Sequence, residues 1–473
     1  MKRLSLLAAA LVLSGCMVGP NYKRPEQALP ATFNEPQPAG QSISEVPVHW
    51  WTLYNDPVLN ELVDSGLERN ADVRQAIARV DEAEAALREA HAILFFPEIN
   101  GQGAVARQRQ IVPGQGSITA TNYLIGLNTS FEVDLWGRLR RGERATVDAL
   151  QASQYARDTV ALTLSATIAR AYFAALSLDS QYAASEEILR AADESLGLAR
   201  RRLEGGVASE LDVYQAGSLR SQAAAQEKEI ARQRAVVVHQ LGVLSGRLDV
   251  QVATKDLNAL PIPPLPPAGL PSTLLQRRPD VRQSEMLLAA ATERIGIQEA
   301  ARFPTLSLTA SGAQASSEFG NLLNSGSRVW SLGANLVGPI IDFGRNKART
   351  EQAEAQARQV AAQYQRSVES AFQDVADALS NVRLAADQEK DLVDQVDQAR
   401  KALRLSQMRY QNGYSAYLEV LDAQRTLNQA LLTFIRNRQA YLSFTVDLMN
   451  ALGGGWVPPE ESTNKAEART TQG

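Results

Sequence analysis

Two short stretches, Trp136-Gly137-Arg138 and Phe343-Gly344-Arg345, decide the fold of this chain. Each follows a segment in which apolar and polar residues alternate, and each precedes a long segment without proline. Their glycines are 344 − 137 = 207 residues apart, and this offset recurs along the chain. It relates Phe96-Pro97 to Phe303-Pro304, Gly206 to Gly413, Val213 to Val420, Leu241 to Leu448 and Gly246 to Gly453. A repeat this long, far above the roughly 20 to 50 residues of solenoid repeats, predicts two halves that fold alike.

The repeat and the composition of the segments around it predict how the chain is divided. The expected parts are a signal peptide (1–15), a lipidated extended N-terminal segment (16–58), a first structural repeat (59–256), a proline-rich connector (257–271), a second structural repeat (272–456) and a disordered tail (457–473). Each repeat should contain a helix, a β-hairpin and a long helical hairpin. The chain's 473 residues exceed the ~250 to 300 at which a single core stops growing, and two halves satisfy that limit.

The charge argues against nucleic acid as a partner, and the composition favours long helices. The net charge is 48 − 52 = −4, with both signs scattered along the chain, so no basic surface for nucleic acid is expected. Aromatic residues make up only 6% of the chain. Together with abundant alanine, glutamine, arginine, glutamate and leucine, this favours long helices with close packing over a globular enzyme core.

The only cysteine, Cys16, lies at the end of a secretory signal. A basic head, Lys2-Arg3, is followed by an apolar stretch, Leu4–Leu13, that is too short to span a bilayer. Leu13-Ser14-Gly15-Cys16 resembles the bacterial lipobox, which implies an N-acylated residue carrying S-diacylglycerol after cleavage. Met17, rather than aspartate, implies the outer membrane by the same resemblance. The alternative is an incidental cysteine in an ordinary signal peptide.

Two segments are expected to be very long helices. Arg138–Glu204 has no proline and only two glycines, and Arg345–Asn412 has neither residue; 67 residues of helix would extend ~100 Å. The first carries a heptad seam, which predicts knobs-into-holes packing. Its residues are Leu164, Ile168, Ala171, Ala175, Leu178, Tyr182, Ser185, Leu189, Ala192, Leu196, Ala199 and Leu203. Both helices end at glycines, Gly205-Gly206 and Gly413, and return helices should run from Ser209 to about Leu244 and from Ala416 to about Leu452.

Between a first helix (about Leu59 to Leu94, with its counterpart in the second half) and the long helices lie segments with a period of two. Apolar and polar residues alternate over 122–133 and 330–336. The expected partner strands are Ile99–Ile111 and Leu306–Ser317. We count four strands near the ~9 to 11 residues of a tilted membrane strand. The alternative is two surface hairpins on a helical protein. Four strands cannot close a barrel, so the strands must be shared between copies of the chain, and three copies would give 3 × 4 = 12 strands. The expected fold class is mixed α and β, with α-helical hairpins continuing below the strands.

At this point the residues resemble a known family, the TolC-like outer membrane factors, in the NodT/OprM-type lipoprotein subgroup. The resemblance rests on Trp50-Trp51 with Asp56-Pro57, Arg278–Arg282, Phe303–Leu308, Asp342–Arg345 and Tyr417–Gln424. It implies a homotrimer in the outer membrane with a twelve-stranded barrel and a helical tunnel extending into the periplasm. It also implies a periplasmic adaptor protein and an inner-membrane, proton-driven transporter of the resistance-nodulation-division class. The expected function is a passive exit duct for small molecules.

The resemblance also places a gate at the tips of the helical hairpins. Leu418 and Asp422 match the family's constricting residues, with Glu419 beside them, and three carboxylates around an axis favour cations. Without the resemblance, Asp422 would be interpreted as a solvated helical carboxylate. Asp212 and Tyr410 match a latch that holds the closed state, although Ser415 replaces the family's basic partner. The turns at Gly205, Gly206 and Gly413 are expected to contact the adaptor.

No catalytic residue, metal site or cofactor is expected. The three histidines, His49, His91 and His239, have no metal-ligand spacing, and no nucleophile elbow or phosphate loop occurs. Two other functions stay open. One is the outer-membrane duct of a type I protein secretion system, and the other is a periplasmic coiled-coil lipoprotein without a pore.

Overall fold

The computed structural model describes residues 17–26, 29–33, 43, 45–113, 116–252, 256–267 and 274–457. The signal peptide, Cys16, part of the connector and nearly all of the tail lie outside these residues. In chain order the helices and strands are α2 (Pro57–Arg69), α3 (Ala71–Phe95), β1 (Glu98–Val112), β2 (Gly116–Val133), α4 (Arg138–Glu204), α5 (Glu210–Ser245), α6 (Leu274–Arg277), α7 (Pro279–Ala300), β3 (Thr305–Ser316), β4 (Arg328–Val337), α8 (Arg345–Gln411) and α9 (Tyr417–Ala451). The expected mixture of long helices and four strands is confirmed.

The chain forms two compact units, and each unit draws on both sequence repeats. The first unit combines Met1–Glu26, Ala78–Gln154 and Gln283–Gln365, and the second combines Gln27–Ile77, Tyr155–Arg282 and Arg366–Gly473. The offset of 207 carries the middle segment of the first unit close to its last segment. Each unit is therefore built from equivalent parts of the two repeats.

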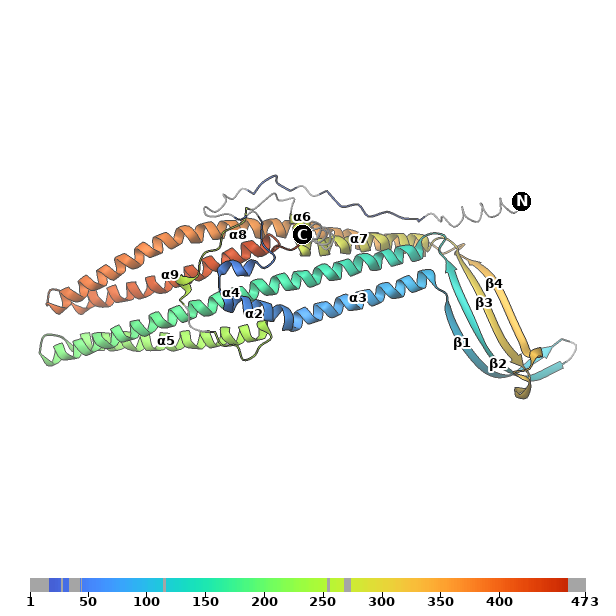
Figure 1. The fold of residues 1–473 in the computed structure, drawn as a ribbon, viewed down its shortest axis with the longest axis horizontal. Helices are drawn as coiled ribbons and strands as arrows, with labels where there is room; N and C mark the ends of the chain where they lie inside the picture. The colour runs from blue at the N-terminus through green and yellow to red at the C-terminus, as the bar shows by residue number, and fades with distance from the viewer. Residues whose placement is uncertain are drawn as a thin grey trace, which may run out of the picture. The chain divides into compact units, whose positions relative to one another are not determined.

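The four strands form one antiparallel sheet in the order β1-β2-β3-β4, with β1 and β4 at its edges (Figure 1). The internal repeat is visible in the pairing. Glu98 pairs with Ser130 in the first hairpin, and Thr305 pairs with Val337 in the second, so both partners shift by 207 residues. The two hairpins therefore have the same register.

The first hairpin is longer than expected. Strands β1 and β2 have 15 and 18 residues, whereas β3 and β4 have 12 and 10. The additional pairs extend to Val112 and Gly116, where Gly116 has a φ of 78° that favours glycine. The expected bounds Ile99–Ile111 agree with β1 to one residue at each end, whereas β2 begins at Gly116, six residues before the expected residue 122, because its pairing continues up to this turn.

The long helices begin and end close to the expected residues. Helices α4 and α8 each have 67 residues, and Figure 1 shows α5 beside α4 and α9 beside α8 as helical hairpins. Every residue of the α4 seam is buried or half-buried, and Ala175, Ala192 and Ala199 are fully buried. Part of α4 is long and apolar enough to cross a membrane, but half of that stretch is buried inside the protein, in keeping with helix packing.

Glycines end both long helices, as expected. Gly206 and Gly413 have φ values of 73° and 78°. The backbone N–H of Val207 donates to the carbonyl of Arg202 at 2.9 Å, and that of Tyr414 donates to Arg409 at 2.8 Å. These bonds satisfy carbonyl groups that the helix leaves unpaired at its C-terminal end.

The single first helix expected over residues 59–94 is instead two helices, α2 and α3, separated at Asn70. The side-chain oxygen of Asn70 accepts from the backbone N–H of Asp72 at 2.7 Å, which starts α3. Its amide group donates to the carbonyl of Leu244 at 3.0 Å. The chain breaks here because a side chain satisfies backbone groups that a continuous helix would pair internally.

Asp56 anchors the start of α2 in the core of the second unit. Its carboxylate accepts from the backbone N–H of Val58 at 2.9 Å and from the hydroxyl of Tyr172 at 3.0 Å. Nearby, Trp50 and Tyr54 are fully buried, and the Tyr54 hydroxyl lies 2.7 Å from that of Thr445. The Trp-Trp and Asp-Pro pairs noted in the sequence are therefore structural.

Candidate functional site

The tips of the α4/α5 and α8/α9 hairpins pack together within the second unit. Small and apolar residues from all four helices form this cluster, which we call the tip cluster: Ala192, Ala199, Ala216, Leu219, Ala223, Tyr410, Tyr417, Val420 and Leu421. The alanines let the helices approach closely. The residues predicted for the gate and latch surround this cluster.

Arg202, in the last turn of α4, joins the two hairpins. Its Nη1 donates to the carbonyl of Tyr410 at 3.0 Å and to that of Gln411 at 3.1 Å. Its guanidinium carbon lies 4.6 Å from the centre of the Tyr410 ring, which is a cation–π contact. A cation placed at the C-terminal end of α8 also interacts favourably with the helix dipole. One side chain thus holds one helix end against the other.

Tyr410, a predicted latch residue, is 4% exposed and packs against Tyr417 at a ring distance of 5.4 Å. Burial, and then the negative charge of Asp212, raise the pKa of Tyr410. Among the described residues, its hydroxyl has no hydrogen-bond partner. The ring of Tyr410, rather than its hydroxyl, makes the contacts in this structure.

Asp212, the other predicted latch residue, lies in the first turn of α5, whose N-cap is Ser209. Its backbone N–H donates to Ser209 Oγ at 3.3 Å, and its carboxylate accepts from the backbone N–H of Ser209 at 3.4 Å. This is a capping box. The structure brings Asp212 close enough to Tyr410 to act on it electrostatically, without a hydrogen bond between the two side chains.

The three predicted gate residues lie in the first two turns of α9. Leu418 is 61% exposed, and Asp422, one turn further on, is also exposed, so both lie on one face of the helix. The Glu419 carboxylate lies 3.4 Å from Nε of Arg409 in an ion pair. Leu418 and Asp422 are therefore free to face another surface, whereas Glu419 has a partner inside the chain.

A groove of about 660 Å³ lies beside the tip cluster. It is lined by α4 and by the adjoining ends of α8 and α9, with Asp193, Glu194 and Arg201 on one side and Gln407 and Gln411 on the other. Its lining is mixed in charge and polarity, which suits a protein surface better than a buried small ligand.

Sequence reasoning missed two residues at this site, Arg202 and Arg409. Both are basic residues in the last turn of a long helix, four residues before the positive-φ glycine that follows it, Gly206 or Gly413. That position is a recognisable signal, because cations are favoured at helix C-termini. Their partners lie on the other hairpin or on the following helix, and no local pattern reveals them.

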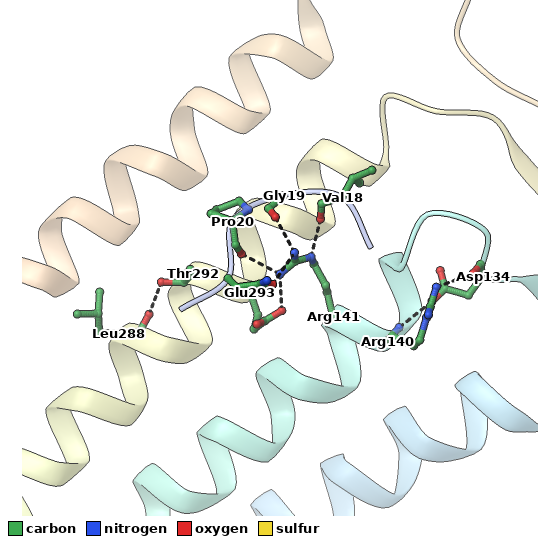
Figure 2. A network of polar contacts seen from close by, with 10 residues as sticks. Val18, Gly19, Pro20, Asp134, Arg140, Arg141, Leu288, Thr292 and Glu293 are labelled. Carbon is green, nitrogen blue, oxygen red and sulfur yellow. Dashed lines mark hydrogen bonds and ion pairs between the residues drawn. The ribbon is translucent and has the colours of Figure 1, made fainter. Parts of the chain in front are cut away.

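The N-terminal segment directly after Cys16 is bound tightly in the first unit, around Arg141 (Figure 2). The Arg141 side chain is fully buried. It donates to three successive backbone carbonyls, those of Val18, Gly19 and Pro20, at 2.6, 2.8 and 2.9 Å. It also pairs with Glu293 of α7 at 2.8 Å. We call residues 17–24 the N-terminal strap.

Two further contacts fix the strap. The guanidinium of Arg24 forms a bidentate pair with Glu285 of α7, at 2.7 and 2.8 Å. At Gly19, with a φ of 96°, an added Cβ would lie 2.5 Å from Cα of Gly296, so the strap can approach α7 only without a side chain there. The strap therefore connects the first repeat, through α4, with the second repeat, through α7.

The sequence and the fold both match known proteins. A family described as "Outer membrane efflux protein" matches residues 62–247 and 270–454, one stretch in each repeat. The probable efflux pump outer membrane protein TtgC of Pseudomonas putida is 34% identical over 99% of both chains. The cation efflux system protein CusC of Escherichia coli is 32% identical, over 94% of this chain and 97% of the relative.

Solved structures agree with the sequence matches. The outer-membrane channel OprN superimposes with a TM-score of 0.87 at 28% identity, covering 94% of this chain and all of OprN. A crystal structure of CusC superimposes with a TM-score of 0.83 at 30% identity, covering 93% of this chain and all of that one. The four-stranded sheet and the long helical hairpins thus define an outer-membrane channel. The chain belongs to the outer membrane efflux protein family, as expected from its sequence. It is an exit duct of an efflux pump, located in the outer membrane and extending into the periplasm.

Proposed function

We propose that three copies of this chain form a passive duct through which small molecules leave the cell. The observation that carries this proposal is the open sheet: β1 and β4 are its edges, and four strands are too few to close a barrel. An unpaired strand edge in hydrocarbon costs several kcal/mol per backbone group, so identical neighbours must supply the missing partners. Three copies give twelve strands around a hollow centre.

The pump partners follow from the architecture and from the relatives. The proposed assembly contains a periplasmic adaptor that contacts the hairpin turns at Gly205, Gly206 and Gly413, and an inner-membrane, proton-driven transporter of the resistance-nodulation-division class. The polar groove beside the tip cluster supports the adaptor contact. The duct itself is proposed to catalyse no reaction and to hold no cofactor.

The cargo is proposed to be small molecules or ions rather than polypeptides. The relatives are described as proteins of toluene, solvent and antibiotic efflux pumps and of a cation efflux system. These descriptions favour an efflux duct over the duct of a protein secretion system. The exposed strands with large apolar side chains, such as Trp330 and Leu332, are unlike a periplasmic spacer without a pore.

The gate is proposed to consist of Leu418 and Asp422, with Glu419 beside them and Asp212 and Tyr410 as the latch. The exposure of Leu418 and Asp422 on one face of α9 supports this role, because a constriction needs side chains that no other part of the protomer covers. Cys16 is proposed to carry the lipid, since it directly precedes the strap that Arg141 holds.

Complementation tests the proposal. The chain is expressed, with and without candidate adaptor and transporter genes, in a drug-sensitive strain that lacks its own outer-membrane duct. We expect resistance to return only when a matching pump is present. Purified protein should form ion-conducting pores in planar bilayers. Protein that stays monomeric in detergent and conducts no current would contradict the proposal.

A further inference from the structure

Phe343 stands out in the first unit because of its exposure and its backbone. It lies between β4 and α8, and its side chain is 98% exposed. Its φ of 53° is in the left-handed region, which costs a bulky residue free energy. Its neighbours Ile340 and Ile341 are 96% and 75% exposed. An exposed apolar segment with a strained backbone, continuous with an edge strand, indicates a surface that another molecule covers.

The internal repeat supplies a template for the missing contact. The equivalent of Phe343 in the first repeat is Trp136, 207 residues earlier. The Trp136 ring stacks on Phe303, with ring centres 4.6 Å apart and planes at 24°. Its Nε1 donates to the carbonyl of Pro304 at 2.8 Å. The junction after β2 is thus fastened to the residues before β3, the next strand in the sheet.

The same offset identifies the surface that should receive Phe343. Phe303-Pro304 corresponds to Phe96-Pro97, the residues directly before β1. Phe96 is 65% exposed, and β1 is the opposite edge of the sheet from β4. Because the two aromatic groups lie at opposite edges of one sheet, Phe343 can meet Phe96 only on another copy of the chain.

The template also fixes the register of the two edge strands. In the chain, Asn128 of β2 pairs with Ser311 of β3. Moving the first residue forward and the second back by 207 places Asn335 of β4 opposite Ala104 of β1 in the next copy. The offset is justified because the two hairpins already share their register across the repeat.

We propose that the contact between copies repeats the contact between the halves of one copy: Phe343 stacks on Phe96-Pro97 of the next copy, and β4 pairs with its β1 with Asn335 opposite Ala104. This inference rests on the proposed ring of three copies and adds its register and its aromatic fastening. The match is in side-chain position and register, because Trp136 does not share the positive φ of Phe343.

Paired cysteines test the register. The variant Asn335→Cys with Ala104→Cys should form a covalent trimer on mild oxidation, because opposed residues of antiparallel strands have Cα atoms about 4.5 to 5.5 Å apart, within disulfide reach. The matched control, Asn335→Cys with Gln108→Cys, places the second cysteine four residues away on the same face and should not cross-link. The parent chain, whose only cysteine is Cys16, gives the background.

Substitutions of Phe343 test the aromatic contact. Phe343→Ala should lower the temperature at which the trimer dissociates in SDS. Phe343→Trp, which adds the donor present at Trp136, should keep that temperature at the parent value or raise it. Phe96→Ala should match Phe343→Ala, and the double variant should be no worse than either, because one contact is lost once. Leu323→Ala, exposed in the β3–β4 loop, is the control.

The outcomes separate this inference from the proposed duct. Cross-linking of the mismatched pair alone, or additive effects of Phe96→Ala and Phe343→Ala, would overturn the inference while a stable trimer still supports the duct. A chain that is monomeric by native electrophoresis in every variant would overturn both.

Discussion

Arg202 joins the two hairpin tips through polar contacts. It provides two hydrogen bonds to backbone carbonyls and a cation–π contact, and it does so from a half-buried position. By contrast, the hydroxyl of Tyr410 has no hydrogen-bond partner in the described part of the chain. In this structure Arg202, above the Tyr410 ring, makes the polar contact between the tips, and no hydrogen bond joins the side chains of the expected pair, Asp212 and Tyr410.

Arg202→Ala should loosen the tip. Two charge-assisted hydrogen bonds and a cation–π contact, reduced by solvent exposure, amount to roughly 2 kcal/mol. Hydrogen exchange at the C-terminal end of α8 should become about tenfold faster or more, and the open fraction in single-channel recordings should rise. Arg201→Ala, an exposed neighbour with the same change of charge, is the control. Equal behaviour of the two variants would show that charge alone matters. Tyr410→Phe keeps the ring that Arg202 contacts and should loosen the tip less than Arg202→Ala.

The raised pKa of Asp148 should make the stability of the first unit depend on pH. Burial, and then the nearby charge of Glu293, raise the pKa of Asp148 from 3.8 to about 6. An acid whose pKa is raised by folding destabilises the protein when it is ionised. The stability that the protein has while Asp148 is protonated is fully present below the unfolded pKa, near 4, and is lost as the pH rises through 6. Acidification from pH 7 to pH 5 should therefore stabilise the protein.

Asp148→Asn should remove that dependence. At pH 7.5 the variant should be more stable than the parent, by about 1 kcal/mol after allowing for partial exposure. At pH 4 the two should melt alike. Thermal melts followed by circular dichroism at several pH values measure this. Glu187→Gln, exposed on the same helix, is the control. A parent melting temperature that falls steadily from pH 7 to 5, in parallel with that of Asp148→Asn, would contradict the assignment.

At the scale of elements, the N-terminal strap is held by one buried arginine. Arg141→Ala would leave Glu293, whose side chain is only 7% exposed, without its partner. Loss of one member of a buried pair costs about 3 to 5 kcal/mol. Trypsin should then cleave after Lys23 much faster than in the parent; the bond after Arg24 precedes Pro25 and resists trypsin. Arg141→Lys should protect only partly, because lysine cannot reach several carbonyls with a planar fork.

The matched control for the strap is Arg144→Ala, because Arg144 is exposed and lies about one turn after Arg141 in α4. It should leave the tryptic pattern unchanged. If cleavage at Lys23 is equally slow in Arg141→Ala and in the parent, the strap is held by other contacts, such as the Arg24–Glu285 pair.

The elements whose ends carry local signals could be predicted from the sequence. Helices α4 and α8 end at glycines that adopt positive φ, and this requirement is visible in the sequence. The break at Asn70 could not be predicted, because it depends on a hydrogen bond to Leu244, which is distant in the chain. The early start of β2 was missed because two polar residues, Thr121-Asn122, interrupt the alternation although pairing continues to Gly116. The strap's course depends on Arg141, whose partners follow no sequence pattern.

The candidate site was predicted in part for the same reason. The exposed face of α9 that carries Leu418 and Asp422 follows from helical spacing and from the family resemblance. The role of Arg202 could not be predicted, because it binds backbone carbonyls, which every residue has. The latch between Asp212 and Tyr410 stays a prediction.

At the scale of the whole molecule, three copies would bring three Asp422 carboxylates around one axis. Asp422→Asn should reduce the preference for cations in planar bilayers, because the ring of negative charge is lost while the side-chain size is kept. Reversal potentials in a salt gradient measure this preference. Asp391→Asn, which removes the same charge from an exposed site on α8, should leave it unchanged. An unaltered reversal potential in Asp422→Asn would place the constriction elsewhere.

The hold of Arg141 on Val18 has a consequence for how deep the protein lies in its bilayer. Only two peptide units separate Val18 from Cys16, a reach of at most ~7 Å. With acyl chains on Cys16, as proposed, the residue that carries the lipid must lie within that distance of Val18, whose backbone N–H donates to the carbonyl of Trp136, just before α4. The anchor would then act as a depth stop, which fixes the level of the inner leaflet relative to the last pairs of the sheet and prevents the barrel from rising or sinking.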